Sequence, residues 1–311
     1  MKTLLIVLPL LLAPLPSALS SFSKEPPELK QGDIFHFGLV DEKSHFDARF
    51  KVLDGKRTNT GDEGIFLLLE SLVSDEGNPV AFRKEKDEEH NSYTGSYAKT
   101  WCANFYEERF DGLEKDYILP IHLSDEAYSV PAAFSFGGKT PNVDFAAEDN
   151  ILDGDHLFLL SAKEASSESY GLAAAENRLA SYDGVTASYW LRSPHDRRNF
   201  PNDVGIVFYN GWLMDFIQDS DNVFGASPIY MRPALNLRKI AGEELYAVSE
   251  NEYCLKQEKD RFVPPSPAPS YTERNPLPGF IAIVIASLLL LIGAPILIVI
   301  LVKRHKRKKA K

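Results

Sequence analysis

The feature that most limits what this chain can fold into is an apolar run without a single charge, Gly279 to Val302. At 1.5 Å per residue, a helix of this length spans the ~30 Å hydrocarbon core of a bilayer. Pro295 lies inside the run, and membrane helices tolerate such a proline. The tail at 303–311 carries seven Lys or Arg, which favour the cytoplasmic side. The sequence therefore predicts one transmembrane helix at 279–302, a basic cytoplasmic tail at 303–311, and the bulk of the chain outside the cell.

The first 20 residues have the pattern of a secretory signal peptide. Lys2 provides a short basic start, an apolar run follows, and Ala18 and Ser20 are small residues at the −3 and −1 positions of a cleavage site. We expect cleavage after residue 20, and an uncleaved N-terminal anchor is the alternative. The remaining organisation is an N-terminal lead at 21–31, an ectodomain at 32–260 and a proline-rich stalk at 261–278, because prolines favour stiff, extended polyproline II.

The charge of the chain is distributed unevenly. The net charge of −10 includes +7 from the tail and +1 from Lys2, so the residues between them carry about −18. An acidic ectodomain is repelled by nucleic acid and by anionic lipid. The composition therefore argues against nucleic acid as a partner and against direct adhesion of the domain to anionic lipid, whereas the basic tail is expected to fix the topology and to contact anionic headgroups.

The residues between lead and stalk show the pattern of a mixed α+β domain with short strands. Tyr97, Trp101 and Phe105 recur every four residues and predict a helix over 96–110. Ser161 and Glu164 form a capping box, which predicts a helix start there. Alternating or continuous apolar runs predict strands at 33–40, 46–52, 65–69 and 157–160.

The second half of the domain is predicted to consist of short strands. The stretch SYWLRSP (188–194) alternates large apolar groups with an arginine. Asn210 and Gly211 both tolerate positive φ, so they predict a type I′ hairpin turn between arms at 204–209 and 212–217. The segment 229–237 reads as a final core strand, although Pro233 requires an edge or a bulge.

Three of these motifs carry a resemblance to a known family. In order, YWLRSP (189–194), VGIVFYNGW (204–212) and MRPALNL (231–237) resemble a bacterial family catalogued as domain of unknown function 6273. GDIFHFG, FKVLD, YAKTWCANFYEERF and DHLFLLSAKEA resemble its upstream elements, so the likeness covers nearly all of 32–240. Cys102 departs from the aliphatic residue usual in its helix. The resemblance implies a bacterial surface protein.

The family in turn is similar to the C-type-lectin-like fold shared with the formylglycine-generating enzyme. The resemblance therefore implies an α+β, C-type-lectin-like ectodomain of short antiparallel strands and about two helices, followed by the membrane helix. This is an analogy between folds, and a fold does not fix a function.

Arginines inside apolar strands admit two interpretations. Arg192 and Arg232 could bind an anion, such as a sialic acid or a sulfate, or they could tie the frame together. An isolated buried charge is costly, so a frame guanidinium must be paired and hydrogen-bonded. We favour the frame interpretation, and we assign to the frame Trp190, Arg192, Pro194, Asn210, Gly211, Arg232 and Pro233.

Two long polar loops are the expected binding surface, because binding often lies in loops on a rigid sheet. They span 195–203 and 218–228. The alternative is that both are solvated connectors. The candidate binding residues are His195, Asp196, Arg197, Arg198, Phe200, Asn202, Asp203, Asp219, Asp221 and Asn222.

The sequence predicts no metal and no cofactor. Asp149, Asp153 and Asp155 do not match a calcium loop, and the calcium motifs of sugar-binding C-type lectins are missing. Cys102 and Cys254 could form a disulfide in an oxidising exterior or remain buried thiols. Neither lies where the formylglycine-generating enzyme would carry its cysteine pair, so no catalytic residue is expected.

These observations predict a non-catalytic surface protein that recognises an extracellular glycan or protein. One alternative is an enzyme or enzyme accessory that acts on envelope polymers. The other is a structural partner of further membrane proteins. The sequence does not distinguish a glycan from a protein ligand, and it leaves the oligomeric state open.

Overall fold

The computed structural model describes residues 27–83, 91–132, 142–147, 150–196, 203–217 and 228–262. The chain divides into two units, Met1–Phe262 and Val263–Lys311, and every described residue belongs to the first. These residues form a mixed α+β domain, as expected. Among them no helix has the length and apolar character needed to cross a bilayer. The expected signal peptide, stalk residues 263–278, membrane helix and tail lie outside the described residues.

The larger sheet has eight strands in the order β17–β18–β1–β2–β3–β16–β4, with β9 also paired to β16. Neighbouring strands are antiparallel except β1 and β18, which are parallel. Their bounds are β1 Ile34–His36, β2 Arg49–Asp54, β3 Ile65–Leu69, β4 Ile118–Leu119, β9 Phe158–Leu159, β16 Pro233–Leu237, β17 Leu245–Ser249 and β18 Glu252–Leu255.

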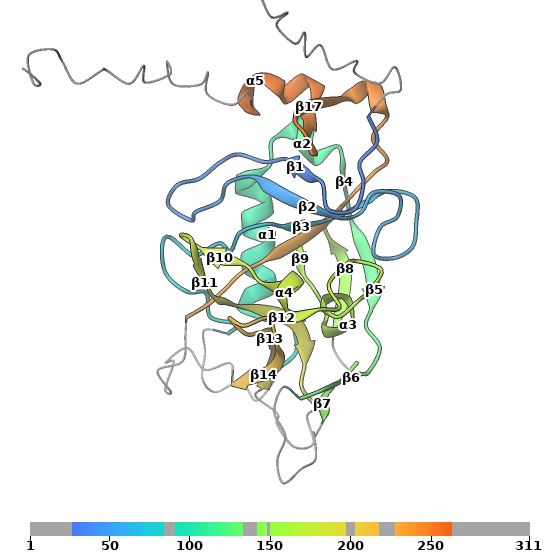
Figure 1. The fold of residues 1–311 in the computed structure, drawn as a ribbon. Helices are drawn as coiled ribbons and strands as arrows, with labels where there is room; N and C mark the ends of the chain where they lie inside the picture. The colour runs from blue at the N-terminus through green and yellow to red at the C-terminus, as the bar shows by residue number, and fades with distance from the viewer. Residues whose placement is uncertain are drawn as a thin grey trace, which may run out of the picture. The chain divides into compact units, whose positions relative to one another are not determined.

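A second sheet has four strands in the order β14–β13–β12–β15, in which β12 and β15 are parallel. Its strands are β12 Ser188–Pro194, β13 Asp203–Val207, β14 Leu213–Ile217 and β15 Ile229–Tyr230. Three two-stranded ribbons complete the described strands: β5 Ile121–Ser124 with β8 Ile151–Asp155, β6 Tyr128–Pro131 with β7 Asn142–Phe145, and β10 Ser181–Tyr182 with β11 Val185–Thr186. Figure 1 shows β6, β7 and β14 at one end of the domain, and β17 and α5 (Lys259–Phe262) at the other.

The described helices comprise one long element and several single turns. Helix α1 spans Tyr97–Arg109, and the Ser96 side chain caps it by accepting a hydrogen bond from the Lys99 N–H. The other α-helices have four residues each: α2 Gly112–Lys115, α3 Ala162–Ala165, α4 Ala175–Arg178 and α5. The capping box predicted at Ser161 and Glu164 is present at the start of α3. The short 3-10 turns are η1 Gly242–Glu244 and η2 Lys256–Glu258.

Strand β2 starts later than its apolar alternation predicted. His45 and Ala48 adopt positive φ angles of 59° and 55°, which interrupt an extended strand. Phe46 therefore forms only an isolated bridge to Asp41, and the regular ladder begins at Arg49. By contrast, the continuous apolar run of β3 is buried at every residue, because it lies between β2 and β16.

The predicted core strand at 229–237 is wrong in one respect, because it is two strands in two different sheets. Its first part is β15 in the smaller sheet, and its second part is β16 in the larger sheet. Pro233 is the first residue of β16, a position where a strand tolerates the missing N–H. The segment thus connects the two sheets, and Arg232 lies at the crossing.

An aromatic core joins α1 to the larger sheet. The rings of Phe46 and Phe105 meet edge to face, with centroids 5.0 Å apart, and Phe110 contacts both Phe37 and Phe50. All five side chains are buried. Helix α1 also contacts β9. This packing fixes α1 against the larger sheet.

Candidate functional site

The structure describes only part of the expected binding loops. His195, Asp196 and Asp203 are described, at the two ends of the loop between β12 and β13. The remaining candidates lie outside the described residues: Arg197, Arg198, Phe200, Asn202, Asp219, Asp221 and Asn222.

The neck of the 197–202 loop, formed by His195 and Asp203, is firmly held. The buried Asn91 side chain donates to the carbonyl oxygens of His195 and Asp203 at 3.0 and 2.8 Å. The His195 N–H also donates to the Asp203 carbonyl at 3.0 Å. His195 Nε2 lies 3.5 Å from an Asp215 carboxylate oxygen. Burial raises the pKa of Asp203, and the charge of Asp215 adds to this effect.

Arg192 forms a buried ion triad with Asp125 and Glu164. Its Nε and Nη2 donate to the two Asp125 carboxylate oxygens at 2.9 and 2.7 Å. Its Nη1 donates to Glu164 Oε2 at 2.7 Å and to the Leu159 carbonyl at 2.6 Å. The Arg192 side chain is 0% exposed, and each carboxylate side chain is 9% exposed. Burial raises the pKa of Asp125, although Arg192 opposes this shift.

A mostly polar hollow of about 310 Å³ lies beside this triad and is lined partly by Asp125, Glu164 and Tyr170. Two of its carboxylates, those of Asp125 and Glu164, are already engaged from inside the protein. Glu164 accepts from the Asn59 amide at 2.7 Å and from the Ser161 N–H at 2.8 Å, in addition to Arg192. The single guanidinium therefore hydrogen-bonds to both carboxylates and fixes the elements that surround the hollow.

Arg232 ties together segments that are distant in sequence. Its guanidinium donates to the carbonyls of Leu69, Glu70 and Arg178 at 2.9, 3.3 and 3.0 Å. It also contacts the Tyr189 hydroxyl at 3.1 Å. Because it is 3% exposed and bound to backbone, its donors face the protein interior rather than a ligand.

The other frame candidates of strand β12 are buried as well. The Trp190 indole donates to the Val80 carbonyl at 2.7 Å. Pro194 ends β12, and the pairing with β13 is irregular between Trp190 and Pro194. Arg192 lies inside this irregularity, where its own N–H donates to the Leu160 carbonyl at 2.9 Å.

The hairpin predicted at Asn210 and Gly211 is present, but its turn is not type I′. Gly211 has a φ of +84°, whereas Asn210 is not among the positive-φ residues. The Gly211 N–H donates to the Phe208 carbonyl at 2.7 Å, and the Phe208 N–H donates to the Trp212 carbonyl at 2.8 Å. This pattern is a three-residue loop that ends in a left-handed glycine.

Contact with α4 explains why Gly211 is required. A Cβ at this position would lie 2.0 Å from the Ala175 carbonyl oxygen. The Arg178 Nε also donates to the Gly211 carbonyl at 2.6 Å. The turn is therefore held against α4 by a close backbone contact and by a side-chain hydrogen bond.

The locked turn presents two exposed aromatic side chains that the sequence reasoning did not select. Tyr209 is 45% exposed and Trp212 is 43% exposed. The other two tryptophans, Trp101 and Trp190, are buried. We call Tyr209 and Trp212 the aromatic tip. The signal was present in the letters YNGW, which place one aromatic residue on each side of the predicted turn.

The two cysteines do not form the disulfide considered above. Cys102 in α1 and Cys254 in β18 are both buried free thiols. Burial raises the pKa of Cys102 to about 12 and that of Cys254 to about 11. Each thiol is therefore protonated and packs as a small apolar group.

Within the described segments, no three acidic, His or Cys side chains are grouped so that they could hold a metal ion. Asp155, one of the acidic residues considered for calcium, pairs with Lys99 at 2.9 Å. Asp153 pairs with His122 at 2.7 Å, and Asp149 lies outside the described residues.

Comparison with known proteins gives one match. Neither the curated proteins nor the solved structures include a match to this chain. A family model matches residues 63–239, which is more than half of the chain and includes Arg192, Arg232 and the aromatic tip. The chain belongs to the family described as Domain of unknown function (DUF6273).

Proposed function

We propose that this chain is a bacterial cell-surface protein with a single membrane helix, whose outward domain recognises a neutral glycan without catalysing a reaction. The observation that carries the proposal is the aromatic tip. Exposed tyrosine and tryptophan side chains on a rigid element are typical of recognition surfaces, because they offer large contact areas at a low entropic cost.

The chemistry of the aromatic tip suits a sugar. One face of a pyranose ring carries polarised C–H groups, which pack on the negative face of an aromatic ring. The Trp212 indole N–H and the Tyr209 hydroxyl can hydrogen-bond to ring hydroxyls at the same time. The segment 208–212 contains no charge, and the surrounding domain is acidic. A neutral glycan is therefore favoured over a sialylated or sulfated one.

The expected C-type-lectin-like architecture belongs to this proposal. It rests on the motif resemblance and agrees with the α+β composition of the domain. The loop neck that Asn91 holds lies at the start of β13, whereas the aromatic tip follows the end of this strand, so the candidate loop would provide a separate contact surface.

One enzymatic alternative would use the carboxylates of the ion triad, which line the polar hollow. Glycoside hydrolysis needs one carboxyl group that is free to donate a proton. The carboxylate oxygens of Asp125 and Glu164 already accept hydrogen bonds from Arg192 and from other internal donors. This arrangement favours a structural role for the pair, and Asp125→Asn would be the direct test of any hydrolytic activity.

The test is binding of the full chain, purified in detergent, to an array of host and bacterial glycans and peptidoglycan fragments. We expect a saturable neutral glycan that Trp212→Ala weakens by about 3- to 10-fold. Tyr246→Ala is the matched control, because Tyr246 is a similarly exposed aromatic residue on β17. Loss of binding in Phe200→Ala alone would move the site to the 195–203 loop. A blank array would leave a protein ligand as the better proposal.

A further inference from the structure

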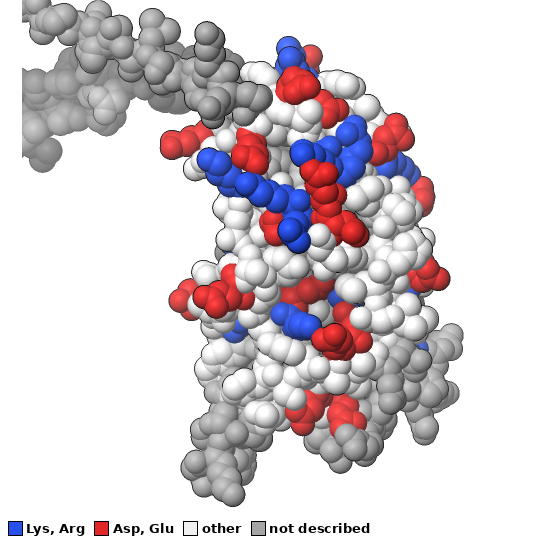
Figure 2. Space-filling model, turned by 90° about the vertical axis from the view of Figure 1, so that its right-hand side faces the viewer, with Lys and Arg blue, Asp and Glu red and all other residues white. Residues whose placement is uncertain are grey.

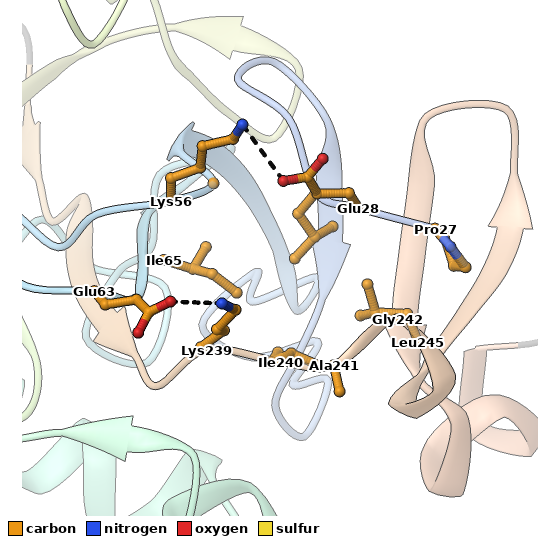
Figure 3. Close-up of a pocket in the computed structure, with 13 residues that line it drawn as sticks. Pro27, Glu28, Lys56, Glu63, Ile65, Lys239, Ile240, Ala241, Gly242 and Leu245 are labelled. Carbon is orange, nitrogen blue, oxygen red and sulfur yellow. Dashed lines mark hydrogen bonds and ion pairs between the residues drawn. The ribbon is translucent and has the colours of Figure 1, made fainter. Parts of the chain in front are cut away.

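A pocket of about 500 Å³ lies at the end of the larger sheet, near the ends of β2, β3 and β16 (Figure 3). It uses no residue of the aromatic tip. A Cβ on Gly55 would lie 2.0 Å from the Leu29 carbonyl oxygen, and a Cβ on Gly64 would lie 2.5 Å from the Leu237 carbonyl oxygen. The walls are therefore fixed by close backbone contacts, and the pocket is preformed.

The pocket has an apolar lining beneath a charged mouth. Leu29, Ile65, Ile240 and Leu245 are core side chains that also line it. Removing an aliphatic group from water against this lining is favourable in proportion to the apolar area buried.

Two ion pairs occupy the mouth (Figure 3). Glu28 and Lys56 are 3.5 Å apart, and Glu63 and Lys239 are 2.5 Å apart. The hydrogen bond with Glu63 raises the pKa of Lys239, and the charge of Glu28 also contributes. The two pairs therefore act on each other, and the mouth presents two positive and two negative groups with no net charge.

All four charged side chains are more than 60% exposed. Exposed pairs contribute little to stability, so they can turn toward a ligand at a small cost. A ligand with charge of one sign would meet a like charge at this mouth. Figure 2 shows that acidic and basic side chains are interleaved on the face that it displays, without a large area of one sign.

We infer that this pocket binds a short peptide whose two ends are both free. An aliphatic side chain packs on the apolar lining, the terminal ammonium meets Glu28 or Glu63, and the terminal carboxylate meets Lys56 or Lys239. The volume falls within the ~300–1,000 Å³ typical of small-ligand pockets and accommodates more than one amino acid. The partner is thus a product of peptide hydrolysis rather than an intact chain.

The probe is the tripeptide Ala-Leu-Ala, titrated into the full chain in detergent by isothermal calorimetry. We expect saturable binding. Lys56→Gln with Lys239→Gln, and separately Glu28→Gln with Glu63→Gln, should each weaken it by about 10-fold. The same tripeptide with an acetylated N-terminus and an amidated C-terminus should bind at least about 10-fold more weakly.

Lys163→Gln is the matched control, because it opens the comparable exposed pair between Lys163 and Glu126. We expect it to leave tripeptide binding unchanged. The inference is overturned if the tripeptide produces no saturable heat, if the blocked peptide binds equally well, or if both double variants bind as the unaltered chain does. Binding could also be lost in only one double variant and with only one of the two peptides that are blocked at a single end. That result would show that one end of the peptide alone is recognised, and it would contradict recognition of both ends.

Discussion

Replacing Arg192 with methionine tests how the domain is held together. The substitution keeps an unbranched apolar stem and removes the guanidinium that bridges Asp125 and Glu164. Both carboxylates then remain buried without their cation. Removing one partner of a buried ion pair costs ~3–5 kcal/mol, and loss of the hydrogen bond to the Leu159 carbonyl adds about 1 kcal/mol. We therefore expect Arg192→Met to destabilise the domain by ~4–6 kcal/mol, a large part of the ~5–15 kcal/mol typical of a folded protein.

Arg49→Met is the matched control. Arg49 also bridges two carboxylates, Glu70 at 2.7 Å and Glu252 at 3.2 Å, but its side chain is 32% exposed. Solvent screening limits such exposed pairs to about 1 kcal/mol or less. Urea denaturation followed by the fluorescence of the buried tryptophans compares both variants with the unaltered chain. If Arg192→Met unfolds within about 1 kcal/mol of the unaltered chain, the guanidinium does not hold the frame and the argument fails.

The same variant has a predictable pH dependence. Without Arg192, the pKa of Asp125 rises further, because burial and the charge of Glu164 raise it and only the smaller effect of Lys163 still opposes them. A carboxyl group whose pKa is higher in the folded than in the unfolded state stabilises the fold at low pH. This stabilisation is lost as the pH rises through the folded-state pKa. The stability deficit of Arg192→Met should therefore shrink on acidification and be larger at neutral pH. A deficit that grows on acidification would contradict this reasoning.

Three further outcomes follow from the frame. Gly211→Ala should destabilise the domain by about 2–3 kcal/mol in urea denaturation, because its φ is +84° and its Cβ would clash with a carbonyl of α4. Gly184→Ala is the control and should cost only about 1 kcal/mol, because Gly184 has a φ of +75° and open space around it. Equal losses of stability in the two variants would refute the clash. Cys102 and Cys254, with pKa values of about 12 and 11, should not react with an aromatic disulfide reagent at pH 8 until urea unfolds the chain. Rapid labelling of the native protein, or a disulfide on a non-reducing gel, would contradict two buried, protonated thiols. Asn91→Ala removes both side-chain hydrogen bonds at the loop neck and should lower the free energy of unfolding by about 2 kcal/mol. Amide hydrogen exchange of His195 and Asp203 should become faster, and unchanged exchange would show that Asn91 does not hold the neck.

Local sequence patterns predicted those helices and strands that are determined by residues close together in the sequence. The capping box of Ser161 and Glu164 begins α3, and the stripe of Trp101 and Phe105 defines the buried face of α1. The apolar run of β3 also lies where it was predicted, because complete burial on both faces leaves a continuous signal.

Features that depend on distant partners could not be predicted in this way. Arg192 was expected to need partners, but Asp125 lies 67 residues away and Glu164 lies 28 residues away, so only the folded chain identifies them. The Asn-Gly dipeptide is compatible with more than one type of hairpin turn. The observed three-residue loop includes a close contact between Gly211 and Ala175, which is distant in sequence. The division of 229–237 between two sheets likewise arises from pairing with strands elsewhere in the chain.

The most direct test of the proposed recognition uses Trp212 as its own reporter. The full chain has three tryptophans, and only Trp212 is exposed, so acrylamide quenching of the native protein reports mainly on the aromatic tip. Titration with the neutral glycan that binds best on the array should shield Trp212 from acrylamide in a saturable way, and Trp212→Phe should bind the glycan without that fluorescence change. Full quenching at a saturating glycan concentration would place the ligand elsewhere and contradict recognition through the aromatic tip.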